Sequence, residues 1–199
     1  MNPFLITGLP RSRTAWMSVF CTTVNSLCYH EPIARMRQVE DLELLLNKPT
    51  PKFVGASDSA LGFFLPWIME NLKPRVVIID RPIEHVRRSV AELGVPHTNY
   101  IDVLKQHLLR FRHHPDVLWI PFHALEEQRM VEKAFWHLLP GEIFDVERYE
   151  LLAKMNITVT LQSVMRQLTP TALENMTRMM NTVEPRIRIA GVSHDPHYH

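Results

Sequence analysis

Residues 75–80 carry four consecutive β-branched apolar residues, from Val76 to Ile79. Such a run is typical of a strand that is buried on both faces, because a half-buried strand alternates apolar and polar side chains. A sheet that is covered on both faces needs helices on both of its sides. This segment therefore favours an α/β domain with a parallel sheet at its centre.

Short apolar runs alternate with helical patterns along the first half of the chain. The predicted strands are residues 4–7, 26–30, 52–57, 75–80 and 117–121, and the predicted helices are residues 14–24, 32–47, 61–72, 83–93, 125–138, 146–154 and 171–180. This alternation implies βαβ crossovers. We therefore expect one α/β domain over residues 1–199, with three α/β/α layers around a mostly parallel five-stranded sheet. Its C-terminal part should be helical from about residue 141 and flexible from about residue 190.

The charge balance limits the classes of ligand. The formal net charge is +1, whereas binders of nucleic acids or membrane surfaces usually show a strong basic excess. No apolar run reaches the roughly 18 residues of a membrane span, and no signal peptide is visible. Two cysteines, Cys21 and Cys28, make no disulfide framework. We expect a cytoplasmic protein that binds neither nucleic acid nor membrane; its oligomeric state stays open.

The segment from Gly8 to Thr14 joins the first predicted strand to the first predicted helix. The first N–H groups of a helix have no internal partner, and the helix dipole favours an anion there. Gly8 allows a sharp turn, Arg11 supplies a charge, and Ser12 and Thr14 supply hydroxyl donors. The second glycine and the lysine of a Walker A loop are missing. The segment predicts a phosphate-binding loop of another kind, although such residues are also ordinary turn and cap residues.

A second polar pair follows the strongest predicted strand. Arg81 comes directly after this strand, and Ser89 lies eight residues later within a predicted helix. An arginine forms forked, charge-assisted hydrogen bonds to phosphate, and Ser89 lies two helical turns along on nearly the same side. Because ligands bind at the carboxyl ends of parallel strands, the loop and this pair should share one edge. The alternative is a surface helix whose arginines are solvated. We expect Arg87 and Arg88 to be solvated in this way.

Together these motifs resemble those of the sulfotransferase family, over roughly residues 4–140. The segment from Pro10 to Trp16 is similar to the family loop, commonly Pro-Lys/Arg-Ser-Gly-Thr-Thr/Ser-Trp/Leu, and the spacing of Arg81 and Ser89 matches its second motif. The resemblance implies a P-loop nucleotide kinase/sulfotransferase-like fold. It also implies transfer of a sulfuryl group from PAPS (3′-phosphoadenosine-5′-phosphosulfate) to a hydroxyl or amine of a small-molecule or carbohydrate acceptor, without a metal. The implied PAPS-binding residues are Gly8, Pro10, Arg11, Ser12, Arg13, Thr14, Ala15, Arg81 and Ser89.

Two loop residues depart from the family pattern. Arg13 stands in place of the usual glycine, and Ala15 in place of a hydroxyl residue. Arg13 either adds a phosphate contact or needs only a relaxed turn, whereas Ala15 removes one donor. A non-catalytic nucleotide-binding module is therefore an alternative. A nucleotide kinase is a weaker alternative, in which Asp80 would bind Mg²⁺ but the lysine is missing.

His30 and Glu31 follow the second predicted strand at the same expected edge. Sulfuryl transfer needs a base for the acceptor proton and a cation at the leaving phosphate, for which Arg11 is the candidate. Neighbouring residues of an extended chain point to opposite sides, so we expect only one of His30 and Glu31 to face the substrate. Resemblance to carbohydrate and bacterial sulfotransferases favours Glu31, with its following proline, as the base and leaves His30 as a structural residue or second candidate. An ordinary polar strand end is the alternative.

Ser57, Asp58 and Ser59 follow the third predicted strand. Asp58 or Ser59 is expected to cap the next helix, because short polar side chains accept the first N–H groups of a helix. A place in the substrate site is the alternative.

Overall fold

The computed structural model describes residues 2–94, 99–155 and 170–189. Within this part of the chain, one sheet has the strand order β2-β3-β1-β4-β5. Its strands are β1 (Asn2–Gly8), β2 (Ser26–His30), β3 (Phe53–Ser57), β4 (Arg75–Asp80) and β5 (Val117–Pro121). All four pairings are parallel. The predicted α/β class and five strands are confirmed, and the sheet is wholly rather than mostly parallel.

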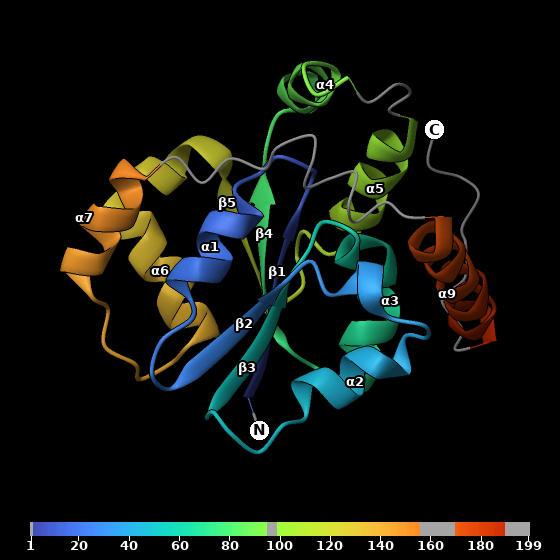
Figure 1. The fold of residues 1–199 in the computed structure, drawn as a ribbon, viewed down its shortest axis with the longest axis horizontal. Helices are drawn as coiled ribbons and strands as arrows, with labels where there is room; N and C mark the ends of the chain where they lie inside the picture. Colours follow the sequence, from blue (N-terminus) through green and yellow to red (C-terminus); the bar gives the residue numbers. More distant parts are fainter. Residues whose placement is uncertain (1, 95–98, 156–169, 190–199) are drawn as a thin grey trace.

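Helices cover both faces of this sheet (Figure 1). One layer holds α1 (Thr14–Phe20), α6 (Gln128–Leu138) and α7 (Val146–Lys154), and the other holds α2 (Glu40–Leu46), α3 (Leu61–Asn71), α5 (Asn99–Leu109) and α9 (Pro170–Ile189). Helix α4 (Ile83–Ala91) lies beyond the carboxyl end of β4, and two 3₁₀ helices are η1 (Ile33–Arg35) and η2 (Phe122–Glu126). The three predicted layers are therefore confirmed.

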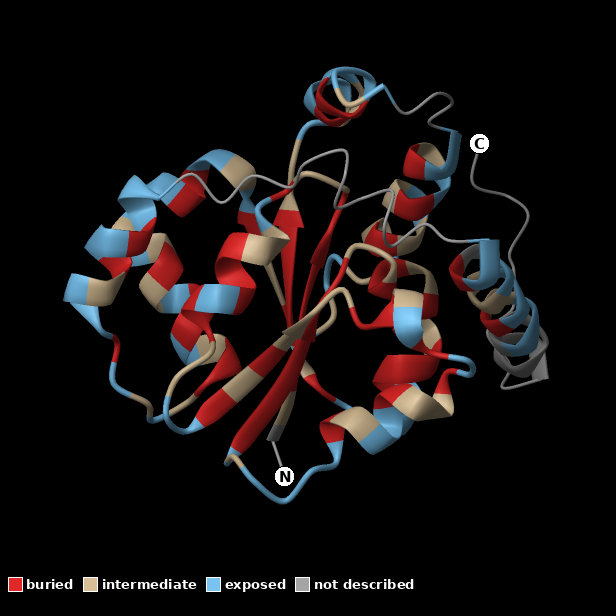
Figure 2. Ribbon diagram, in the orientation of Figure 1, coloured by how far each residue is buried: buried red, intermediate tan, exposed pale blue. Residues whose placement is uncertain are grey.

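Each face of the sheet has its own apolar core, and Figure 2 shows the strands largely buried. In β4, Val76 and Ile78 pack toward α3 and α5, whereas Val77 and Ile79 pack toward α1 and α6. All four side chains are 0% exposed. The apolar run that predicted a doubly covered strand is thus explained residue by residue, because successive side chains of a strand point to opposite faces.

The predicted helix over residues 32–47 is wrong, because the chain forms η1 and then α2. Met36, between them, is extended with a ψ of 149°. The Asp41 carboxylate accepts hydrogen bonds from the N–H groups of Arg37 and Gln38, at 2.8 and 3.2 Å. An aspartate that binds backbone N–H groups in this way competes with a continuous helix and starts a new one.

Two other predicted helices have wrong boundaries. The first ends at Phe20 instead of residue 24, since the chain turns there and the N–H of Thr23 bonds to the carbonyl of Ser26. The helix predicted from residue 125 becomes α-helical only at Gln128, because η2 precedes it. Both errors lie at helix ends, where turn residues rather than apolar spacing decide the conformation.

Helix α5 is absent from the predicted elements. Its buried residues Ile101, Leu104 and Leu108 follow helical spacing, and this is the signal that could have found it. Leu104 and Leu108 pack so closely on α3 that a Cβ added at Gly62 would lie 2.4 Å from Leu104 Cδ1. The flexible end predicted from residue 190 lies outside the described residues. None of the described helices combines the length and apolar character that crossing a membrane requires.

Candidate functional site

The predicted phosphate loop lies between β1 and α1, at the carboxyl edge of the sheet (Figure 1). Gly8 pairs with Ile79 of β4. A Cβ added at Gly8 would lie 2.5 Å from the Ile79 carbonyl oxygen, which is backbone and cannot move aside easily. The glycine is therefore required by close approach of two strands. Beyond it the chain turns through Arg11 and Arg13, whose φ angles are 65° and 60°.

Replacing Gly8 by alanine is expected to destabilise the protein by roughly 2 kcal/mol, because the new methyl group overpacks the β1–β4 contact. For a chain of this size that lowers the melting temperature by about 4–8 °C. Gly94→Ala is the control: Gly94 has a φ of 72° and open space around it, so only the conformational term of about 1 kcal/mol applies. Differential scanning calorimetry distinguishes them, and an equal or smaller loss for Gly8→Ala would contradict the close-approach argument.

Arg13 occupies the left-handed position at the N-terminus of α1, where the family loop has glycine. Its turn thus keeps a glycine-like conformation in spite of the side chain. The guanidinium lies 3.3 Å from the Glu126 carboxylate and 5.2 Å from the Phe122 ring centroid. Arg13 is therefore tied to η2. Ala15 lies in the first turn of α1.

Ser12 and Thr14 are held differently from each other. The Ser12 hydroxyl is buried and has no hydrogen-bond partner among the described residues. The Thr14 carbonyl accepts a hydrogen bond of 2.8 Å from the Ser57 hydroxyl, which joins the start of α1 to the end of β3. The end of the loop is thus anchored to β3 by a bond from a side chain to the backbone.

The phosphate loop and the second motif contact each other directly. Arg11 donates from Nε to the Ser89 hydroxyl at 3.2 Å, and Arg81 donates from Nη1 to the Arg11 carbonyl. The expectation that both motifs share one sheet edge is confirmed. Arg81 Nε is buried and has no hydrogen-bond partner among the described residues, so a donor of the second motif is left for a ligand.

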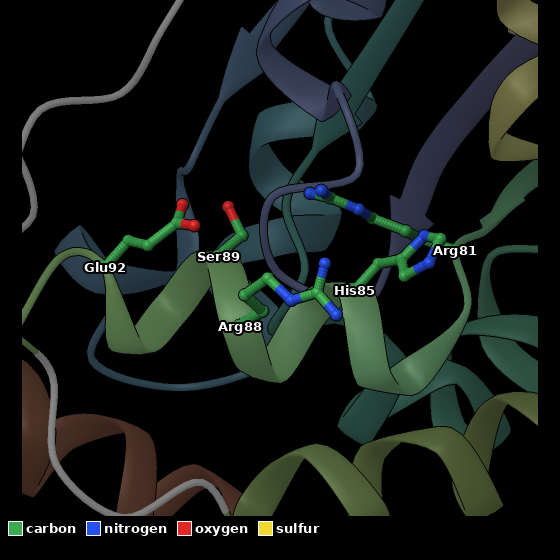
Figure 3. A pocket seen from close by; sticks show the side chains of 5 residues that line it. All are labelled: Arg81, His85, Arg88, Ser89 and Glu92. Atoms are coloured by element: carbon green, nitrogen blue, oxygen red, sulfur yellow. The ribbon is translucent and has the colours of Figure 1, made fainter.

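A pocket of about 240 Å³ lies over α4, lined by Arg81, His85, Arg88, Ser89 and Glu92. In Figure 3, the Arg81 side chain extends from the end of β4 across α4 toward Ser89 and Glu92. Two residues of the second motif therefore face one cavity, as expected. His85, Arg88 and Glu92 were not predicted as site residues. His85 lies four residues before Ser89 and Glu92 three residues after it, so helical spacing places both on its face of α4 and could have identified them, whereas Arg88 is directly next to Ser89.

Positive charge accumulates at this edge. The pKa of Arg81 is lowered by burial, and further by the neighbouring charges of Arg11 and Arg13; Glu92 opposes this effect. The Arg81 guanidinium also lies 4.6 Å from the Phe122 ring centroid, so Phe122 contacts two arginines of the site. Like charges that crowd together lower one another's affinity for protons and raise their affinity for an anion. The site is built for a negatively charged ligand.

His30 and Glu31 do not point to opposite sides, so that expectation is wrong. Glu31 has a φ of 50°, which ends the extended geometry on which the expectation depended. The two side chains meet, with His30 Nε2 3.8 Å from Glu31 Oε1. Burial lowers the pKa of His30, and Glu31 opposes this shift. His30 Nε2 and Glu31 Oε2 are buried without a hydrogen-bond partner among the described residues.

Neither Asp58 nor Ser59 is the N-cap of α3 as predicted, because Ala60 occupies that position without a side-chain cap bond. Asp58 Oδ1 accepts the N–H of Ala60 at 2.8 Å, just before α3. Its Oδ2 accepts the N–H of Ile33, at the start of η1, at 3.1 Å. Burial, with a smaller contribution from the nearby Glu31, raises the pKa of Asp58 to about 7 although the bonds from the N–H groups of Ala60 and Ile33 lower it. The carboxyl thus joins two segments at the edge of the sheet.

Other charged groups near the edge are paired. Asp80, the Mg²⁺ ligand of the kinase alternative, contacts Lys105 and lies 3.8 Å from Arg112. Arg87 forms ion pairs with Glu84 and Asp102 at 2.8 and 2.7 Å, so it contacts carboxylates instead of being merely solvated. In the described part of the chain, no group of three or more His, Cys, Asp or Glu side chains could hold a metal ion.

No protein-family model and no curated protein matches the chain. Among solved structures, mouse sulfotransferase SULT7A1 complexed with PAP matches with a TM-score of 0.57 and 12% identity, covering 94% of this chain and 82% of that one. A sulfotransferase from Alicyclobacillus acidocaldarius matches with a TM-score of 0.48 and 13% identity, covering 94% and 99%. The first match extends over nearly the whole chain. The chain therefore has the fold of a sulfotransferase.

Proposed function

We propose that this protein transfers a sulfuryl group from PAPS to a hydroxyl or amine of a small-molecule or carbohydrate acceptor. One observation carries the proposal: Arg11 bonds to Ser89 while Arg81 bonds to the Arg11 backbone. Two phosphate-binding motifs, 70 residues apart in sequence, thus meet on a sulfotransferase fold. Such a double site suits a nucleotide with phosphate groups at two ends. The PAP complex of the mouse structural neighbour supports this ligand class.

The two motifs would hold opposite ends of the nucleotide. The loop N–H groups from Gly8 to Thr14 and the Arg11 guanidinium suit the 5′-phosphosulfate, because the first turn of α1 offers unpaired donors. Arg81 and Ser89 suit the 3′-phosphate, since they line the pocket on α4. The buried Arg81 Nε provides a donor that has no protein acceptor among the described residues.

The chemistry needs a base and a charge stabiliser. Glu31 is proposed to take the proton of the acceptor hydroxyl while the acceptor oxygen forms a bond to sulfur. The bond between sulfur and the phosphate oxygen breaks, and PAP (3′-phosphoadenosine-5′-phosphate) leaves with the electron pair. Arg11 and the loop N–H groups stabilise the charge that develops on this leaving group. His30, with its lowered pKa, is mostly neutral near neutral pH and is the second candidate for the base.

Two observations argue against a nucleotide kinase. The loop carries no Walker lysine. Asp80, which would bind Mg²⁺, is engaged by Lys105 and Arg112. A non-catalytic module would keep the phosphate contacts and lose the base. Here His30 and Glu31 meet at the expected edge, each with a buried polar atom that no other described residue bonds. The arrangement therefore favours transfer over binding alone.

Calorimetric titration with PAP, and separately with ATP and Mg²⁺, tests the proposal. We expect PAP to bind at least about tenfold more tightly, because two phosphate clamps engage PAP and the Mg²⁺ ligands of a kinase are missing. Tighter binding of ATP with Mg²⁺ would overturn the proposal. Tight binding of PAP with no release of sulfate from PAPS would instead assign the non-catalytic module.

A further inference from the structure

The end of β3 connects three other parts of the candidate site. The N–H of Asp58 bonds to the Ile6 carbonyl of β1 at 3.1 Å. The Ser57 hydroxyl bonds to the Thr14 carbonyl at 2.8 Å, and the Ser57 carbonyl accepts the N–H of Glu31 at 2.8 Å. The candidate base is therefore attached to β3 through its own backbone.

Asp58 is an unusual residue for the short turn before α3. Its side chain is 5% exposed, and a buried carboxylate loses the hydration that stabilises its charge. Serine or asparagine can also accept the N–H two residues ahead, without a charge to bury. The second acceptor bond, from Ile33, is what a carboxylate adds here, because its two oxygens reach two separate segments.

The turn that begins at Glu31 is held on both sides, by Ser57 at the end of β3 and by Asp58 directly after it. Its first residue is in the left-handed region, with a φ of 50°, which costs a residue with a side chain roughly 1–2 kcal/mol. The N–H of Glu31 is held by the Ser57 carbonyl, and the N–H of Ile33 by Asp58. These two bonds hold the strained conformation that brings the Glu31 carboxylate beside His30.

We propose that Asp58 is a positioning residue for Glu31: by binding the N–H of Ile33, it keeps the Glu31 carboxylate beside His30 and toward the acceptor. Asp58 itself touches neither nucleotide nor acceptor in this scheme. The inference rests on the proposed function, in which Glu31 takes the acceptor proton. The position of the Glu31 carboxylate beside His30 can be tested even without a turnover assay.

Asp58→Asn and Asp58→Ser are the informative variants. Asparagine keeps the size but offers one acceptor oxygen in place of two. Serine reaches the N–H of Ala60, two residues ahead, and is too short for that of Ile33. It therefore separates the bond to Ala60 from the bond that holds the turn at Ile33. Asp41→Asn is the matched control. Asp41 also accepts hydrogen bonds from two backbone N–H groups, but these N–H groups lie in the connection before α2.

Three measurements are made on each variant: the pKa of His30 by proton NMR, the rate of sulfate release from PAPS, and the affinity for PAP. Glu31 raises the pKa of His30, so displacing Glu31 should lower the pKa of His30 toward the value found in Glu31→Gln. We expect the rate to fall about 10- to 100-fold through misplacement of the base, with PAP affinity changed less than about twofold. Asp41→Asn should change none of the three.

The outcomes separate this inference from the proposed function. An unchanged pKa of His30 and an unchanged rate in both folded Asp58 variants would overturn the inference while PAP binding by the unmodified protein stands. A preference of the unmodified protein for ATP would overturn the proposed function, and the His30 titration would still report whether Asp58 holds the turn. Thermal unfolding of each variant shows that it is folded. A loss of PAP affinity as large as the loss of rate would also reject positioning, because it would indicate a general collapse of the site.

Discussion

Replacing Arg81 by methionine is expected to weaken PAP binding about 100-fold. Arg81 lines the α4 pocket, and its buried Nε donor has no hydrogen-bond partner in the part of the chain that the structure describes. Hydrogen bonds to charged groups contribute about 1.5–3 kcal/mol each, so loss of two such bonds to a phosphate, at the lower limit of about 3 kcal/mol, reduces the affinity by about two orders of magnitude. Methionine retains a long unbranched side chain that can still pack on Phe122. Isothermal titration of PAP measures the change.

Arg87→Met is the matched control for this prediction. It removes the same charge from a nearby position, but Arg87 forms ion pairs with Glu84 and Asp102 and does not line the pocket. Its effect on PAP affinity should stay below about threefold, as expected for a surface charge that only adds to the general field. Equal losses for both variants would show that PAP responds to net charge. An unchanged PAP affinity in Arg81→Met would show that the 3′-phosphate binds at another site.

The parts of the fold that the sequence predicted are those with local signals. Both faces of β4 are covered, so all residues from Val76 to Ile79 are apolar. Four consecutive apolar residues can be recognised from the sequence alone. The sequence also predicted that one edge of the sheet holds Arg11, Arg81 and Ser89, because the carboxyl ends of parallel strands lie at the same edge. Their contact confirms the placement. The expected topology of the sheet therefore predicted the location of the site residues better than any single motif did.

The errors have a common physical origin in long-range contacts and unusual backbone conformations. The alternation rule failed at Glu31 because its φ of 50° depends on bonds to residues of β3. The second acceptor bond of Asp58, to Ile33, joins residues 25 positions apart. Helix α5 was missed because few of its residues are buried. The conformation of Glu31 and the second bond of Asp58 have no signature within a short window of sequence, whereas the helical spacing of the buried residues of α5 is such a signature.

Replacing Glu31 by glutamine is expected to slow sulfate release from PAPS by about 10²- to 10⁴-fold, the usual contribution of a general base. The amide keeps the size and shape of the side chain but cannot take a proton. PAP affinity should change little, because Glu31 lies at the end of β2, away from the α4 pocket residues. Radiolabelled PAPS gives the rate with water as the acceptor, so the natural acceptor need not be known.

The acceptor can be changed to show that proton removal is the missing step. 4-Nitrophenolate at alkaline pH carries no proton, so transfer to it should be nearly as fast in Glu31→Gln as in the unmodified protein. His30→Gln is the companion variant, because its imidazole lies 3.8 Å from Glu31 and is the other candidate base. A defect that is larger in His30→Gln, and that 4-nitrophenolate relieves, would assign the base to His30. A defect of Glu31→Gln that persists with 4-nitrophenolate would give Glu31 a role in holding the site, since a base is not needed for an acceptor that is already ionised.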